Sequence, residues 1–327
     1  MQTAQLQDFS RPILDAACQQ WGLSSPARVS EAENLLFACQ SPNGKVALRM
    51  THPLHRDASQ LTAELDWIAR LAQKKIPVVN PLPSKNDNWV ETISLANKSW
   101  HACVFRWIEG APIKNENQTV TENSIQLWGG LTSQIIAASL EMNRLGDRLP
   151  RHHWNSPIPG QPTLDKQLRP EHPFLADDIA AAQASLEQLP RTPDTYLLAH
   201  TDLHAGNVFQ TKTGSLIALD FDDCCYHYLL QEFSMPIYYS LLFTEKDLKT
   251  EAKRFLQSFL VGYRKYHDID PDSLELLPLF FKLRDLDLRA ISFLWNIPRD
   301  SKWYRRIEYV YENGNPLSEL PWAKWAK

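Results

Sequence analysis

A short loop in the second half of the chain gathers residues that could perform acid–base and metal chemistry. The segment HTDLHAGN contains His200, Asp202, His204 and Asn207. An aspartate can accept a proton from a reacting hydroxyl group, and carboxylate and amide oxygens are ligands that suit Mg²⁺. Apolar runs flank this loop on both sides, as is typical of buried strands. The pattern therefore predicts a reactive loop between two buried strands.

A further aspartate follows the loop at a distance that a hairpin would close. The segment VFQTKTGSLIALDFDD has two apolar runs on either side of a polar turn, which predicts a β-hairpin. Asp202 and Asn207 lie at the start of this hairpin, and Asp220 lies at its far end. Folding the hairpin returns Asp220 toward the loop. We therefore expect two carboxylates and one amide to converge on a single Mg²⁺ ion.

The first 108 residues contain most of the strands that must position this site. The runs LLFAC and KVALRM flank Asn43-Gly44, a strong hairpin signal because both residues tolerate positive φ. The runs IPVVNPLPS, WVETISL and SWHACVFRWIEG predict three more strands. Helical spacing predicts an opening helix that ends at Gly22 and a longer one over DASQLTAELDWIARLAQKK, with Asp57 in its first turn.

The chain beyond Gly110 is predicted to be mainly helical. Two helices are expected over QLWGGLTSQIIAASLEMNRLG and DDIAAAQASLEQLP, with a long proline-rich irregular insertion between them. After the hairpin, the apolar run YHYLLQEFSMPIYYSLLF predicts another helix. We therefore predict one α+β unit of two lobes, residues 1–108 and 109–327.

Composition and charge limit the possible partners. The 327 residues carry a net charge of −4, and the Lys and Arg residues are scattered, which argues against a nucleic-acid partner. No window approaches eighteen apolar residues and the N-terminus lacks a signal-peptide pattern, so we expect no membrane segment. The five cysteines form no CxxC motif, which favours a reducing compartment, and we predict a cytoplasmic protein. The sequence indicates no oligomeric state.

The motif around the reactive loop resembles a known family. H-x-D-x-x-x-x-N, followed thirteen residues later by Asp220, resembles the catalytic and metal loops of kinase-fold enzymes. HTDLHAGN with LDFDD is similar, more narrowly, to the aminoglycoside phosphotransferase and choline kinase family. The resemblance implies a two-lobed protein-kinase-like fold with a strand-rich N-lobe and a mostly helical C-lobe. It also implies transfer of the γ-phosphate of ATP, with Mg²⁺, to a hydroxyl of a small molecule such as an amino alcohol, amino acid, sugar or aminoglycoside.

The resemblance also implies roles for individual residues of the loop. Asp202 is expected to accept or orient the proton of the attacking hydroxyl, and Asn207 and Asp220 are expected to hold Mg²⁺. Four neighbouring side chains are expected to support the site: His200, His204, Asp222 and Asp223. Of these, His200 is expected to brace the loop through hydrogen bonds.

The nucleotide is expected to bind mainly to the N-lobe. VALRM resembles the strand that supplies a phosphate-binding cation, with Arg49 where the family usually has Lys, and LTAELDWIARL resembles the helix whose Glu64 fixes that cation. FRWIEG resembles the hinge that holds adenine. The expected adenine-binding residues are Phe105, Trp107, Phe209 and Leu219.

Three other functions remain open from the sequence. A protein Ser/Thr kinase of the same fold is one, although no long activation segment follows LDFDD. A non-catalytic nucleotide-binding scaffold is another, because the covering loop near RVSEAENLL lacks glycine and Arg49 replaces Lys. A hydrolytic metal site at His200 and His204 is the third, but further clustered His residues are missing.

Two further segments have structural interpretations. The charges of RDLDLR, residues 284–289, fall at helical spacing, and we predict a salt-bridged helix face rather than a second acidic site. The aromatic residues near the C-terminus could enclose a cationic substrate, but packing of the last helices onto the core is the favoured interpretation.

Overall fold

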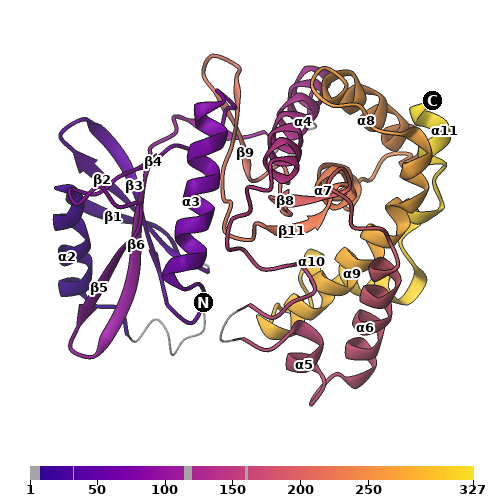
Figure 1. The fold of residues 1–327 in the computed structure, drawn as a ribbon. Helices are drawn as coiled ribbons and strands as arrows, with labels where there is room; N and C mark the ends of the chain where they lie inside the picture. Colours follow the sequence, from indigo (N-terminus) through magenta and orange to yellow (C-terminus); the bar gives the residue numbers. More distant parts are fainter. Residues whose placement is uncertain (1–7, 32, 114–119, 159–160) are drawn as a thin grey trace.

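The computed structural model describes residues 8–31, 33–113, 120–158 and 161–327. Two lobes are visible, a strand-rich N-lobe and a mostly helical C-lobe, as the sequence predicts (Figure 1). The N-lobe consists of α2 (Arg11–Trp21), β1 (Ser24–Glu31), β2 (Leu35–Ser41), β3 (Gly44–Thr51), α3 (Ala58–Gln73), β4 (Pro81–Leu82), β5 (Glu91–Leu95) and β6 (Lys98–Arg106).

The remaining elements contain two small sheets among helices. The strands are β7 (Gly110–Pro112), β8 (Tyr196–Ala199), β9 (Val208–Thr211), β10 (Leu216–Ala218) and β11 (Cys225–Tyr228). The helices are α4 (Glu122–Arg144), α5 (Leu164–Leu168), α6 (Pro173–Glu187), α7 (Leu229–Leu241), α8 (Leu248–Tyr263), α9 (Leu277–Leu294), α10 (Lys302–Asn313) and α11 (Trp322–Ala326), with 3₁₀ turns at Pro271–Leu276 and Pro316–Glu319. Within the described residues, no helix is both long enough and apolar enough to cross a membrane.

The N-lobe sheet is antiparallel and follows the order β1-β2-β3-β6-β4, with β5 also paired to β6. Helix α2 lies on one side of this sheet and α3 on the other, between the sheet and the C-lobe (Figure 1). Apolar residues of α2 pack with one face of β2, β3 and β6, and apolar residues of α3 belong to the core that continues into the C-lobe. The carboxylate of Asp57 caps α3 by accepting a hydrogen bond from the backbone N–H of Gln60 at 2.8 Å.

Three details of the N-lobe differ from the sequence prediction. The β2–β3 turn is centred on Pro42 and Asn43, and of the pair Asn43-Gly44 only Gly44 has a positive φ, 113°. Proline fixes φ at about −65°, which suits the first central position of a turn, so the turn begins one residue earlier than predicted. Strand β1 was not predicted, because its mostly exposed residues show no alternation of apolar side chains. The run IPVVNPLPS forms only the two-residue strand β4.

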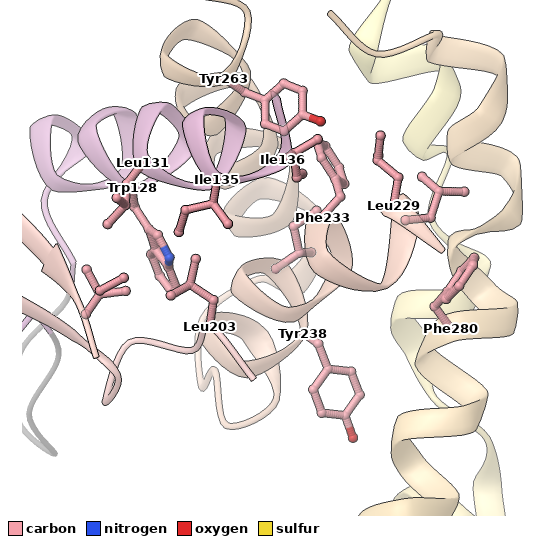
Figure 2. Packing of buried hydrophobic residues seen from close by; sticks show 14 of the residues in the cluster. Trp128, Leu131, Ile135, Ile136, Leu203, Leu229, Phe233, Tyr238, Tyr263 and Phe280 are labelled. Carbon is pink, nitrogen blue, oxygen red and sulfur yellow. The ribbon is translucent and has the colours of Figure 1, made fainter. Parts of the chain in front are cut away.

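The catalytic loop predicted from the sequence rests on a large apolar core. Leu203 is fully buried and belongs to the same cluster as Trp128 and Ile135 of α4, which Figure 2 shows from close by. Strand β8 enters the loop and pairs with β11, while β9 leaves it and pairs with β10. The run after LDFDD therefore begins as strand β11 rather than as a helix, and helix α7 starts only at Leu229.

Candidate active site

The loop between β8 and β9 is held in one conformation by His200. Its ring is fully buried, and Nε2 donates a hydrogen bond to the backbone oxygen of Leu219 at 2.8 Å. Nδ1 of the same ring accepts from the backbone N–H of Asp202 at 3.3 Å. Thr201 between them has a φ of 66°, a conformation that non-glycine residues seldom adopt. His200 thus links the start of the loop to the end of the β9–β10 hairpin.

The hairpin brings Asn207 into contact with Asp202 and returns the chain to Asn207 one residue before Asp220. The amide nitrogen of Asn207 donates to the backbone oxygen of Asp202 at 3.0 Å and contacts its carboxylate Oδ2 at 3.3 Å. The backbone N–H of Leu219, the residue before Asp220, donates to the backbone oxygen of Asn207 at 2.8 Å. Because the Asn207 nitrogen is engaged, its Oδ1 is the atom that this side chain can offer to a metal ion.

Asp220 has the properties of a free metal ligand. It adopts a φ of 60°, and its side chain is accessible to solvent, with no hydrogen bond or ion pair among the described residues. The surrounding protein nevertheless desolvates its carboxylate and raises the pKa to about 6, and the charge of Asp222 acts in the same direction. An unpaired carboxylate beside a free amide oxygen is a donor set that fits Mg²⁺.

Asp222 and Asp223 contact the segment that leads into α3. Oδ2 of the buried Asp222 lies 2.5 Å from Nε2 of His55, and Oδ1 of Asp223 lies 2.7 Å from Nη2 of Arg56. Burial alone would raise the pKa of Asp222, but the charges of Arg56 and His55 lower it well below its ordinary value. Asp222 is therefore ionised, and both carboxylates are already engaged by N-lobe side chains.

A second group of potential metal ligands lies beside the first. Glu33, His55 and Asp222 offer ligand atoms that lie within 4.8 Å of one another. Glu33 belongs to the glycine-free segment RVSEAENLL, in which residue 32 is outside the described residues. Burial raises the pKa of Glu33 to about 8, and the charges of Asp223 and Asp222 add to the effect. The segment predicted to cover the nucleotide thus points an acidic side chain at the site.

Arg49 and Glu64 form a buried bidentate ion pair between β3 and α3. Both terminal nitrogens of Arg49 lie 2.8 Å from a carboxylate oxygen of Glu64. The side chains are only 7% and 1% exposed, so this is not the solvated surface pair that such residues often form. The guanidinium also lies 5.2 Å from the ring centroid of Phe105. The pairing expected from the family resemblance is therefore present.

The four predicted adenine-binding residues occupy two different environments. Phe105 is buried, and its ring faces the guanidinium of Arg49. The ammonium of Lys45 lies 3.6 Å from the centroid of the Trp107 ring. Phe209 lies opposite Ile217 in the β9–β10 hairpin and Leu219 is partly buried at its end. Hydrogen bonds from Val79 N to Ala218 O at 2.9 Å and from Ala218 N to Pro77 O at 3.0 Å join the hairpin to the N-lobe.

His204 lies against the Asp202 carboxylate from within the loop. Its Nδ1 accepts from the backbone N–H of Gly206 at 2.9 Å, and its Nε2 lies 3.5 Å from Oδ2 of Asp202. Burial lowers the pKa of His204, so the ring is neutral near pH 7. A Cβ atom at Gly206 would lie 2.7 Å from Cε1 of this ring, so glycine is the residue that fits here.

Arg284 is a site residue that the sequence prediction missed. Its Nη2 lies 2.6 Å from Oδ1 of Asp202, and its Nε donates to the hydroxyl of Tyr239 at 2.8 Å. The predicted salt-bridged face of residues 284–289 is therefore wrong, because the charges pair with other elements. Arg289 pairs with Glu308, and Asp285 accepts hydrogen bonds from other helices and turns. Arg284 lies 82 residues from Asp202, and no motif connects the two.

Comparison with known proteins identifies the family of this chain. A family model described as "Phosphotransferase enzyme family" matches residues 27–271, which is more than half of the chain. The chain belongs to this family, as the sequence motif predicts, and it is a kinase.

Individual relatives agree with this assignment. Amicoumacin kinase of Bacillus subtilis (strain 168) is 27% identical over 333 residues, which cover 95% of this chain and 94% of the relative. A solved structure of amicoumacin kinase hAmiN with AMP-PNP, Ca²⁺ and Ami has a TM-score of 0.86 at 22% identity and covers 99% of both chains. A microcompartment-associated aminopropanol kinase has a TM-score of 0.66 at 20% identity, covering 93% of this chain and 99% of that one. These structural likenesses confirm the two-lobed kinase-like fold.

Proposed function

We propose that this protein transfers the γ-phosphate of ATP, in the presence of Mg²⁺, to a hydroxyl group of a small molecule. The observation that carries the proposal is the geometry of the β9–β10 hairpin, in which hydrogen bonds join Asn207 to Asp202 and join Leu219, the residue before Asp220, to Asn207. The names of the relatives support an acceptor such as an amino alcohol or an antibiotic of the amicoumacin type.

The residues of the loop have separate roles in this proposal. Asp202 accepts the proton of the attacking hydroxyl, since its Oδ2 makes only long contacts, at 3.3 and 3.5 Å. Asp220 and the amide oxygen of Asn207 hold the metal ion. When bound, that ion neutralises charge on the β- and γ-phosphates of the nucleotide. His200 braces the loop, and His204 stays neutral beside Asp202.

The nucleotide binds between lobes that we assign to residues 1–108 and 109–327. Arg49, oriented by Glu64, contacts the α- and β-phosphates. The adenine lies between the end of β6 and the β9–β10 hairpin, against residues among Phe105, Trp107, Phe209 and Leu219. We also place the protein in the cytoplasm, a proposal supported by its five cysteines, all of which are free thiols.

A small-molecule acceptor fits the structure better than a protein acceptor. Protein kinases use a long segment after the metal aspartate, which is ordered when the enzyme is active. Here only Cys224 separates Asp223 from β11, and β11 leads directly into α7. This short connection leaves no such segment in the described part of the chain.

A phosphate-transfer screen tests the proposal. The wild type is incubated with Mg²⁺, labelled ATP and a panel containing amicoumacin, aminopropanol, ethanolamine and aminoglycosides. We expect transfer to at least one acceptor, and Asp202→Asn should reduce the rate by about 100-fold or more because the proton acceptor is lost. Binding of AMP-PNP, measured by calorimetry, should persist in both proteins. Intact nucleotide binding without transfer to any acceptor would instead support a nucleotide-binding scaffold.

A further inference from the structure

The two oxygens of the Asp202 carboxylate have different surroundings. Oδ1 lies 2.6 Å from Nη2 of Arg284, whereas Oδ2 has longer contacts, 3.3 Å to the Asn207 amide and 3.5 Å to the His204 ring. Among the described residues, Arg284 and His204 are the ion-pair partners of Asp202. One oxygen is thus firmly engaged, and the other remains available to a hydroxyl donor.

Arg284 is itself held in place by a neighbouring helix. It belongs to α9, and its Nε donates to the hydroxyl of Tyr239 on α7 at 2.8 Å. The guanidinium carbon also lies 5.1 Å from the centroid of the Tyr239 ring. The Arg284 and Asp202 side chains are only 15% and 21% exposed, so solvent screens their attraction weakly. Because Tyr239 holds the planar guanidinium of Arg284 in place, the guanidinium restricts the rotation of the Asp202 carboxylate that it binds.

We infer that Arg284 is a positioning residue for phosphoryl transfer, acting through Asp202. It retains Oδ1 and thereby directs Oδ2 toward the acceptor. This inference rests on the proposed function, in which the acceptor O–H bond breaks and its proton passes to Oδ2. The acceptor oxygen then forms a bond to the γ-phosphorus as the bond from that phosphorus to the bridging oxygen breaks, and ADP leaves. Helices α7 and α9 of the C-lobe therefore contribute to the catalytic geometry.

A matched control lies on the same helix. Arg289 of α9 pairs with Glu308 at 2.5 Å, and its side chain is 15% exposed, the same fraction as that of Arg284. Arg289→Gln therefore breaks an ion pair of similar burial that does not involve Asp202. The comparison of Arg284→Gln with Arg289→Gln separates an effect on the carboxylate from a general loss of helix packing.

The experiment measures kcat and the KM for ATP with Mg²⁺ and with aminopropanol and amicoumacin as acceptor probes. We expect Arg284→Gln to lower kcat by about 10- to 100-fold while the KM for ATP changes by less than about twofold. Arg284→Lys should recover part of the rate, because the charge remains while the planar fork is lost. Arg289→Gln should retain the wild-type kcat. In an Asp202→Asn background, Arg284→Gln should cause no further loss, since the two residues act as one unit.

The possible results are distinguishable. Equal kcat in Arg284→Gln and Arg289→Gln, or a full additional loss in the Asp202→Asn background, would overturn the role of Arg284 while the proposed function stands. Loss of AMP-PNP binding in Arg284→Gln would also overturn it, because the residue would then act on the nucleotide. If the wild type transfers phosphate to no acceptor, or Asp202→Asn is fully active, the proposed function fails and the role of Arg284 fails with it.

Discussion

At the scale of single residues, Arg49 and Glu64 form a buried ion pair to which the proposed function also assigns a part in nucleotide binding. Their side chains are 7% and 1% exposed, so each charge depends on the other for compensation. Removing one partner of a buried ion pair is costly, whereas replacing both with apolar residues is often tolerated. The pair therefore offers a way to separate folding from nucleotide binding.

We expect Arg49→Met to lower the free energy of unfolding by about 3–5 kcal/mol, because Glu64 is left buried without a partner. The double variant Arg49→Met/Glu64→Leu should recover most of this stability in urea denaturation. Neither variant should regain wild-type affinity for AMP-PNP, because both lack the cation that we propose binds the phosphates. A double variant that binds AMP-PNP as the wild type does would contradict the role of Arg49.

Residues within the motif could be predicted, but their distant partners could not. The spacing of Asp202, Asn207 and Asp220 predicts their convergence, since a hairpin needs only local turn and strand signals. Arg284 follows from no such signal, because it reaches Asp202 through the packing of α9 against α7. Its i,i+3 spacing to Asp287 favoured a partner on its own helix, and tertiary contacts overrode that preference.

At the scale of elements, α4 and α8 approach unusually closely. A Cβ atom on Gly262 of α8 would lie 1.7 Å from the backbone oxygen of Gln126 on α4, and one on Gly129 would lie 2.1 Å from that of Phe259. These glycines thus permit backbone contact between the two helices that support the core beneath the loop of residues 200–207. Neither glycine is distinguished in the sequence, where glycine within a helical pattern is simply unfavourable.

We therefore expect Gly262→Ala to destabilise the protein by about 1–3 kcal/mol or more, since a backbone atom must move to admit the methyl group. Gly130→Ala is the matched control. Its Cβ would meet Tyr266 at an ordinary distance of 3.5 Å, and alanine favours the helix by about 1 kcal/mol. Thermal unfolding should show a lower midpoint for Gly262→Ala and an equal or higher one for Gly130→Ala. Similar midpoints for the two variants would argue against the close helix contact.

Strand β11 makes the protein sensitive to acid through His227. Burial lowers the pKa of this side chain to about 3, whereas an unfolded chain takes up the proton below about pH 6.5. Stability is therefore lost as the pH falls below 6.5, by about 1.4 kcal/mol per pH unit from this group, or about 2 kcal/mol by pH 5. His227→Asn retains an acceptor for the Tyr228 N–H but cannot be protonated. Its unfolding free energy should fall less steeply between pH 6.5 and 5, and parallel curves would contradict the prediction.

At the scale of the whole molecule, buried arginines connect the two lobes at the site. Arg151 of the C-lobe donates to the backbone oxygens of Gln60 on α3, at 3.1 Å, and of Asp222, at 2.6 Å. Arg56, which precedes α3, donates to the carboxylate of Asp223 at 2.7 Å. The two-lobed fold is predictable from the order of strands and helices. The arginine contacts between the lobes are not predictable, because each arginine donates hydrogen bonds to atoms far away in the sequence that no local pattern identifies.

The measurement that tests the account most directly is a crystal structure with AMP-PNP and Mn²⁺ in place of Mg²⁺. The anomalous signal of manganese locates the ion independently of the protein atoms. We predict an ion about 2.1 Å from a carboxylate oxygen of Asp220 and from Oδ1 of Asn207, with the γ-phosphate facing Asp202. An ion bound instead by Glu33, His55 and Asp222, with Asp220 and Asn207 unoccupied, would contradict the proposed site.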